Sequence, residues 1–272
     1  MDISTNYQTK IMGVINANED SFFKESRFEG AFAISRIEQM INDGANIIDI
    51  GGVSSRPGSV SVSSDEELFR VKPIIDSIYE QRLYDKTEFS LDSYDPFVLK
   101  YALDRGFKIV NDITGLSNDE VCKIASYYNA KVVIMHMQNN PNNMQKKPEY
   151  NDVVLDIDNF FKERIKKAKS FGLEEIILDV GIGFGKTLTH NLKLLKNLDY
   201  FKHFGCELLI GASRKSMIDM ISPSSIEERL PGTLAIHLAS IENGASIIRC
   251  HDVKEHNQAI KVQEAIKRAE IL

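Results

Sequence analysis

Residues 44–52 read Gly-Ala-Asn-Ile-Ile-Asp-Ile-Gly-Gly, and this stretch contains the pattern that decides the fold. Gly44 follows a segment with helical spacing of apolar residues, and a glycine at that position commonly ends a helix. Asn46–Ile50 is rich in isoleucine, which is typical of a short strand buried on both faces. Asp49 then places a carboxylate at the carboxyl end of that strand, before two glycines of a loop.

Similar units occur eight times along the 272 residues. The predicted strands are Lys10–Ile15, Asn46–Ile50, Glu88–Leu91, Phe107–Val110, Lys131–Met135, Glu175–Leu178, Cys206–Ile210 and Ser246–Cys250. The predicted helices between them are Ala31–Asp43, Glu66–Tyr79, Pro96–Arg105, Asp119–Tyr128, Val154–Phe171, Asn191–Leu198, Pro231–Asn243 and Glu255–Ala269. Strands that alternate with helices indicate a parallel sheet, and eight units in this length favour a closed barrel over an open doubly wound sheet. We therefore predict an α/β fold, a (β/α)8 TIM barrel that residues 1–272 form as a single domain.

Composition narrows the class of protein. The net charge of −6 and the pI near 5.6 give no support for binding to nucleic acid. Cys122, Cys206 and Cys250 are widely separated and form no CxxC motif, so we expect a reducing cytoplasm and no disulfide framework. Met1–Lys10 lacks the apolar core of a signal peptide, and no apolar run is long enough for a membrane helix. We expect a cytoplasmic chain without a membrane partner.

Polar residues stand at the end of nearly every predicted strand. In chain order they are Asn16, Asp49, Asp92, Asn111 with Asp112, His136, Asp179, Ser213-Arg214-Lys215, and Arg249 with His251. In an α/β barrel the carboxyl ends of the strands meet at one face, which is where the active site lies. A shared polar pocket is the interpretation we favour, and the alternative is that these residues only cap the helices that follow.

Three of these residues suggest what the pocket binds. Asp92, Asn111 and Asp179 present carboxylates and an amide, which suit a flat heterocycle that carries many hydrogen-bond donors. Asp112 is expected to be structural, because adjacent strand residues point to opposite faces.

An anion site is predicted beside the heterocycle. Arg249 and His251 lie two residues apart, so both can face one side and donate to phosphate oxygens. The loop Gly51–Gly58 adds glycines, hydroxyl groups and Arg56, although its alternative interpretation is a flexible connection.

Two other patterns are rejected as functional motifs. Gly181–Thr187 resembles a P-loop, but Val180 stands where that motif requires its first glycine. The histidines show no HExxH pair or clustered spacing, so a catalytic zinc is not expected. Met135 is expected to line a wall of the pocket, whereas Met137 and Met144 are expected to be loop or core residues.

Taken in order, the motifs resemble the dihydropteroate synthase family, from about Ile11 to Glu264. They are Met-Gly-Val-Ile-Asn at 12–16 with Asp20-Ser21-Phe22, Ile48–Gly52 with Ser54–Gly58, Met135-His136-Met137 with Met144-Gln145, Leu178–Thr187, Ser213–Ser216, Arg229–Thr233 and Ile248–Val253. This resemblance implies a transferase of folate biosynthesis, a sulfonamide target, that joins a hydroxymethyl-dihydropterin pyrophosphate to p-aminobenzoate and releases pyrophosphate. It also implies a homodimer.

The resemblance implies a role for each matching residue. Asn16 would help to hold Mg²⁺ at the pyrophosphate, and Met135 would line the pterin pocket. The pterin would lie against Asp92, Asn111, Asp179 and Lys215. The pyrophosphate would contact Ser55, Arg249 and His251, and p-aminobenzoate would contact Arg56, Pro57, Phe184, Lys215 and Ser216. The expected catalytic residues are Asp92, Asp179, Lys215 and Arg249.

Departures from the family pattern keep one alternative open, and a related class of barrels supplies a second. Ala17-Asn18-Glu19-Asp20 stands where the family usually has Val-Thr-Pro-Asp, and Val53 replaces a usual Glu. One alternative is a degenerate relative that binds pterin without turnover. The other is a non-catalytic pterin-binding barrel of the kind found in corrinoid methyltransferases, which would not need Arg56, the Ser213–Ser216 run or the Arg249 and His251 pair.

Overall fold

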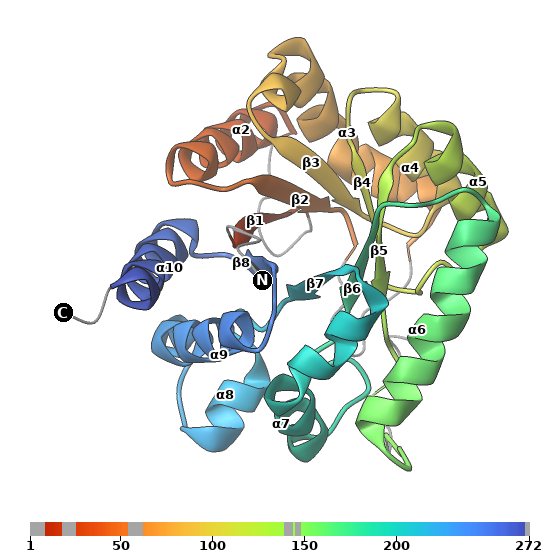
Figure 1. The fold of residues 1–272 in the computed structure, drawn as a ribbon. Helices are drawn as coiled ribbons and strands as arrows, with labels where there is room; N and C mark the ends of the chain where they lie inside the picture. The colour runs from red at the N-terminus through yellow and green to blue at the C-terminus, as the bar shows by residue number, and fades with distance from the viewer. Residues whose placement is uncertain (1–8, 18–25, 54–61, 139–143, 145–147, 270–272) are drawn as a thin grey trace.

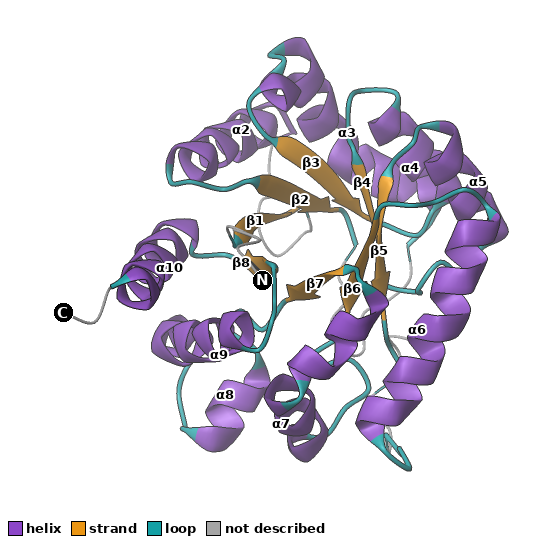
Figure 2. Cartoon of the chain, viewed as in Figure 1, coloured by secondary structure: helices purple, strands orange, loops and turns teal. Residues whose placement is uncertain are grey.

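The computed structural model describes residues 9–17, 26–53, 62–138, 144 and 148–269. Parallel strands close into a barrel in chain order, from β1 to β8 and back to β1. The strands are β1 (Lys10–Asn16), β2 (Ile47–Gly51), β3 (Glu88–Asp92), β4 (Ile109–Asp112), β5 (Lys131–Met135), β6 (Ile176–Asp179), β7 (Glu207–Ile210) and β8 (Ile247–Cys250). Helices surround the strands on all sides (Figures 1 and 2). The predicted TIM barrel is confirmed.

The helices of the described chain follow the strands in turn. They are α2 (Ser26–Asn42), α3 (Ser64–Glu80), α4 (Pro96–Leu103), α5 (Asp119–Tyr127), α6 (Val153–Ser170), α7 (Leu188–Lys196), α8 (Ser216–Ile221), α9 (Leu230–Glu242) and α10 (Val253–Arg268). Short 3-10 turns occur at η1 (Leu83–Asp85), η2 (Leu198–Phe204) and η3 (Glu227–Arg229). No helix in the described segments is both long and apolar enough to cross a lipid bilayer.

Among the differences from the sequence prediction, three have a clear local cause. Strand β4 begins two residues later than predicted and runs through Asn111 and Asp112, because pairing with β5 continues where the apolar run ends. Helix α7 begins three residues earlier than predicted, at a capping box between Thr187 and His190. Helix α8 was not predicted, since its six residues are too few to show a helical period.

The predicted helix ends at glycine are confirmed. Gly44 has φ +103°, Gly106 +89°, Gly172 +80° and Gly244 +101°, so each occupies the left-handed region in which a side chain is strained. Each of these turns returns the chain toward the amino-terminal end of the next strand. The glycines therefore set the direction of the strands that carry the polar residues.

Strand alternation sorts the inward side chains into layers. The central layer is the apolar cluster of Met12, Ile47, Ile109, Val133, Ile177, Leu209 and Ile247, all at most 2% exposed. Two residues further along each strand, the inward positions include Asp49, Asn111, Met135, Asp179 and Arg249. The apolar layer therefore forms the base on which a polar layer rests, at the carboxyl ends of the strands.

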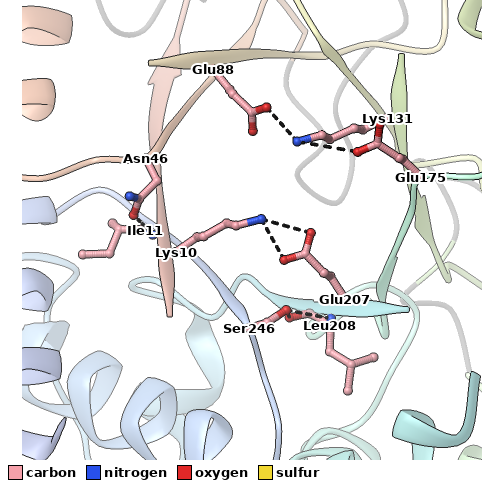
Figure 3. A network of polar contacts seen from close by, with 9 residues as sticks. All are labelled: Lys10, Ile11, Asn46, Glu88, Lys131, Glu175, Glu207, Leu208 and Ser246. Carbon is pink, nitrogen blue, oxygen red and sulfur yellow. Dashed lines mark hydrogen bonds and ion pairs between the residues drawn. The ribbon is translucent and has the colours of Figure 1, made fainter. Parts of the chain in front are cut away.

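The amino-terminal end of the barrel has a different polar layer (Figure 3). Lys10 Nζ lies 2.9 Å from Glu207, and Lys131 Nζ lies 2.6 Å from Glu88 and 3.8 Å from Glu175. These side chains point toward one another, so both lysines have acidic partners across the barrel. Because the charges are paired within the layer, it closes the end of the barrel and offers little to a ligand.

Candidate active site

Arg249 on β8 links two carboxylates across the mouth of the barrel. Its Nε donates to Asp49 Oδ2 at 2.7 Å, and its terminal nitrogen donates to Asp92 Oδ2 at 2.7 Å. Asn111 Nδ2 donates to the same oxygen of Asp49 at 3.1 Å. Four side chains from β2, β3, β4 and β8 therefore form one connected polar floor, which we call the Arg249 floor.

Charges within the Arg249 floor influence one another strongly. Burial alone would lower the pKa of Arg249, but the nearby Asp49 and Asp92 raise it, so the guanidinium stays charged. Burial raises the pKa of Asp92, which Arg249 opposes and Asp49 reinforces. Asp49 is fully buried, and its Oδ1 accepts no hydrogen bond from the described residues. The floor thus has acceptor capacity for a ligand that donates.

Asp179 adds a third carboxylate beside the Arg249 floor. It ends β6, lies opposite Met135 of β5 in the register, and its Oδ1 accepts from the backbone N–H of Gly181 at 2.7 Å. Burial raises the pKa of Asp179, while the bond from Gly181 and the charges of Lys215 and Arg249 oppose that rise. Met135 itself is buried, at the inward position two residues beyond Val133 of the central apolar layer.

Lys215 enters the site from the connection between β7 and α8. Its Nζ lies 4.4 Å from the centre of the Phe184 ring and also donates to the carbonyl oxygen of Ile182. Burial lowers the pKa of Lys215 to about 8, against the opposing effect of Asp179. Ser216 follows as the exposed first residue of α8. A lysine whose pKa is lowered to about 8 therefore lies against an aromatic ring and within electrostatic reach of Asp179.

The rim of the site contains His251 and Asn16. The Nδ1 of His251 lies 2.9 Å from Ser213 Oγ, so the connections after β7 and β8 meet there. Asn16 ends β1 and pairs in register with Gly51. Both side chains are half-buried, as expected for groups at an opening.

The structure brings together most of the residues predicted to form the site. Asp92, Asn111, Asp179, Lys215 and Arg249 are linked by the contacts and charges above. Ser55, Arg56 and Pro57 lie outside the described residues. Arg249 was grouped with His251 as part of an anion site, but its hydrogen bonds in the structure are to carboxylates of the floor.

Asp49 is the member of the Arg249 floor to which sequence reasoning gives no role. Its position in the sequence identifies it as a strand-end carboxylate without indicating a role. The available signal was its position: it follows Ile47 of the central apolar layer by two residues on β2, and therefore faces inward like the other members of the floor. Asp112 behaves as predicted for a structural residue, since its carboxylate accepts from the backbone N–H groups of Thr114 and Leu116.

The glycine-rich segment 181–187 does not form a phosphate loop. Lys186 is 4% exposed, and its Nζ contacts His136 Nδ1 at 3.0 Å and the carbonyl oxygens of His136 at 3.2 Å and Phe184 at 3.0 Å. Burial lowers the pKa of Lys186 well below its ordinary value. A lysine enclosed in this way by protein acceptors is not available to a nucleotide phosphate, which agrees with the rejection of the P-loop motif.

Comparison with known proteins identifies the family. Residues 12–251 match the family model described as "Pterin binding enzyme". The chain is 42% identical to dihydropteroate synthase of Escherichia coli (strain K12) over 258 residues, which cover 94% of this chain and 90% of that protein.

Solved structures agree with the sequence match. The Yersinia pestis dihydropteroate synthase, solved as a sulfonamide drug complex, superposes with a TM-score of 0.90 at 35% identity and covers 99% of this chain and 97% of its own. The Thermus thermophilus dihydropteroate synthase in complex with 4-aminobenzoate gives 0.86 at 32% identity, with 95% of each chain covered. The chain therefore belongs to the dihydropteroate synthase family, the transferases that move a pterin group onto p-aminobenzoate in folate biosynthesis.

Proposed function

We propose that the Arg249 floor and the residues around it bind the two substrates of this transferase in the arrangement that the sequence indicates. The pterin lies against Asp92, Asn111, Asp179 and Lys215, with Met135 beside it. Its pyrophosphate faces Ser55, Arg249 and His251, and p-aminobenzoate lies among Arg56, Pro57, Phe184, Lys215 and Ser216. The observation that carries the proposal is the Arg249 floor itself, which joins the carboxylates of two strand ends to one guanidinium and one amide.

The same arrangement suits a dissociative substitution. The bond between the pterin methylene carbon and the pyrophosphate oxygen breaks, and pyrophosphate leaves with the bonding electrons. The amine nitrogen of p-aminobenzoate then bonds to that carbon and loses a proton. Asp92 and Asp179 favour the positive charge that develops on the pterin methylene, and Arg249 offsets negative charge on the departing oxygen. No protein nucleophile is needed in this sequence of steps.

Magnesium is proposed as the metal of this reaction. In the described part of the chain, His, Cys, Asp and Glu form no group of three that could hold an ion. Asn16 offers one amide oxygen at the rim, which fits Mg²⁺, because this ion often takes only one or two protein ligands together with substrate phosphates and water. Asn16 would hold the ion, and the ion would neutralise charge on the pyrophosphate.

The direct test is a synthesis assay. Purified protein is incubated with the pterin pyrophosphate, labelled p-aminobenzoate and Mg²⁺, and labelled dihydropteroate is measured. We expect product that increases with Mg²⁺ concentration, because the metal would arrive with the substrate pyrophosphate. Pterin binding without any product would instead identify a pterin-binding protein that has lost turnover.

The role of Arg249 can be tested by separating it from its carboxylate partner. Asp49→Asn/Arg249→Met removes the cation and one charge of the floor, and Asp49→Asn alone is the matched control. Relative to that control, we expect the Kd for the pterin pyrophosphate to rise about tenfold more than the Kd for the free pterin, as for loss of a charge-assisted hydrogen bond. Calorimetry with both ligands measures this, and an equal loss for the two would show that Arg249 only supports the floor.

The charges of the site predict a bell-shaped pH dependence of kcat/KM. As pH falls, Asp92 and Asp179, whose pKa values are raised by burial, take up protons and lose acceptor strength. As pH rises, Lys215 loses its proton near its lowered pKa of about 8. Lys215→Arg keeps the charge at high pH, so we expect the alkaline decrease to disappear.

The matched control for this measurement is Lys123→Arg. Lys123 lies on the exposed surface of α5 in an ion pair with Glu120, and its replacement should leave the profile unchanged. A Lys215→Arg enzyme that still loses kcat/KM above pH 8 would assign the alkaline group to another residue.

We also propose that the chain forms a homodimer through α8 and α10. Met220 and Ile221 on α8 and Val262 and Ile266 on α10 are between 55% and 71% exposed, and large exposed apolar side chains of this kind are what a subunit interface would bury. Figure 1 shows α8, α9 and α10 beside one another in the ring of helices. Sedimentation should therefore give a dimer mass that falls to a monomer mass in Met220→Glu/Ile266→Glu, and a monomeric wild-type chain would contradict the proposal.

A cytoplasmic location is proposed on the state of the cysteines. Cys122, Cys206 and Cys250 are all free thiols, and Cys122 and Cys250 are buried. Free thiols are typical of proteins that work in a reducing compartment.

A further inference from the structure

Helix α9 contacts the segment that leads into Lys215. Thr233 and His237 lie one turn apart on α9 and are 0% and 1% exposed. The backbone N–H of Ala212 donates to His237 Nε2 at 3.1 Å, and the backbone N–H of Arg214 donates to Thr233 Oγ1 at 3.0 Å. Two side chains of one helix face therefore hold the backbone immediately before Lys215.

His237 is in turn bonded to a second buried histidine. Its Nδ1 lies 2.8 Å from Nε2 of His256 on α10, and Nδ1 of His256 lies 2.6 Å from the carbonyl oxygen of Asp252. Because Ala212 donates to His237 Nε2, that nitrogen must accept, and a neutral ring carries its proton on Nδ1. The same argument gives His256 an accepting Nε2 and a proton on Nδ1 that is donated to Asp252.

Asp252 closes the connection back to the starting segment. It occupies the N-cap position of α10 but makes no capping hydrogen bond with its side chain. Its carboxylate instead accepts from Arg214 Nε at 3.0 Å and from a terminal nitrogen of Arg214 at 2.5 Å. Arg214 has φ +55°, an unfavourable conformation for a residue with a side chain, so these bonds hold a strained turn.

The resulting circuit joins two connections of the active-site face. It runs from Ala212 through His237, His256 and Asp252 to Arg214, and thus ties the segment after β7 to the segment after β8. Ser213, which lies between Ala212 and Arg214, contacts His251 through its hydroxyl group. Lys215 follows Arg214 directly in the chain. Lys215 and His251, the two proposed substrate contacts, therefore extend from the segments that the circuit ties together.

We propose that His237 and His256 are a positioning pair that, in its neutral form, sets the placement of Lys215 and His251 in the active site. The inference rests on the proposed roles of Lys215 and His251. Each ring nitrogen has one hydrogen-bond role. A proton added to Nε2 of His237 would face the N–H of Ala212, and one added to Nε2 of His256 would face the N–H of His237.

The surroundings keep the pair neutral. Burial lowers the pKa of His237 well below 6.5, and the charges of His256 and Lys215 act in the same direction. Burial also lowers the pKa of His256, although Asp252 and Glu255 of α10 oppose this. A histidine with a lowered pKa binds fewer protons when folded than when unfolded. Its contribution to stability is therefore present above pH 6.5 and lost as pH falls below that value.

The test compares His237→Gln with His237→Leu. Glutamine can accept from Ala212 and donate to His256 without titrating, whereas leucine fills space and does neither. We expect His237→Leu to lose about tenfold in kcat/KM for p-aminobenzoate, because small displacements of a site residue are costly. The alkaline decrease that reports Lys215 should also move from about pH 8 toward higher pH as the lysine becomes more exposed.

The glutamine variant and a surface control make the result specific. His237→Gln should restore the alkaline limb and bring kcat/KM within about threefold of the wild type, since both hydrogen bonds can form. His203→Gln, at a half-exposed histidine of η2, should match the wild type throughout. A folded His237→Leu enzyme with an unshifted alkaline limb would overturn the proposal, because loss of stability alone does not move that limb.

A measurement without substrate separates this inference from the proposed function. Nitrogen-15 NMR of the wild-type histidine rings at pH 7.5 should show His237 and His256 both neutral, with the proton on Nδ1. A charged ring, or a proton on Nε2 of either, would overturn the pair even if catalysis were as proposed. If the tautomers are as expected but Lys215→Arg leaves the pH profile unchanged, the assignment of Lys215 fails instead.

Discussion

The interaction on which the site depends is the contact of Arg249 with Asp49 and Asp92. A carboxylate with no exposed surface, such as Asp49, is stable in the barrel only beside a compensating positive charge. Removal of one partner from a buried ion pair typically costs about 3–5 kcal/mol, because the other charge remains without compensation. The guanidinium therefore holds three strand ends, those of β2, β3 and β8, in one arrangement. The positions of Asn111 and Asp179 around it follow from the register of the same barrel.

The alternation of side chains along the strands places one polar layer at each end of the barrel, and the two layers differ in how fully their charges and hydrogen bonds are paired. At the amino-terminal end, the charges of Lys10, Glu88, Lys131 and Glu207 are paired with one another. At the carboxyl end, an oxygen of Asp49 lacks a donor among the described residues, and Lys215 has a pKa lowered to about 8. Groups whose charge and hydrogen bonding are incompletely satisfied are available to a ligand. Chemistry is therefore expected at the second layer, although both layers contain acidic and basic side chains.

The sequence predicted those features that depend on local pattern. Buried apolar runs located the strands, and Asp43-Gly44 and similar pairs located the helix ends, because a left-handed turn requires little more than a glycine. Polar strand ends located most of the site. The partners of those residues could not be predicted, since they come from other strands: the link of Arg249 to Asp49 spans 200 positions in the chain. Helix α8 was missed for a different reason, its shortness.

The segment 181–187 resembles a phosphate-binding loop in composition but has a structural role. A side chain at Gly181 would place its Cβ 1.9 Å from the carbonyl oxygen of His136, so this glycine permits close approach of protein backbone rather than of a phosphate. Lys186 contacts the carbonyl oxygen of Phe184 from inside the protein, and Lys215 contacts that of Ile182 from the site. The two lysines thus bond to two carbonyl oxygens of the loop, and Lys215 also lies against the Phe184 ring. Glycine and lysine are used here to hold a loop against the protein, which neither residue type alone would indicate.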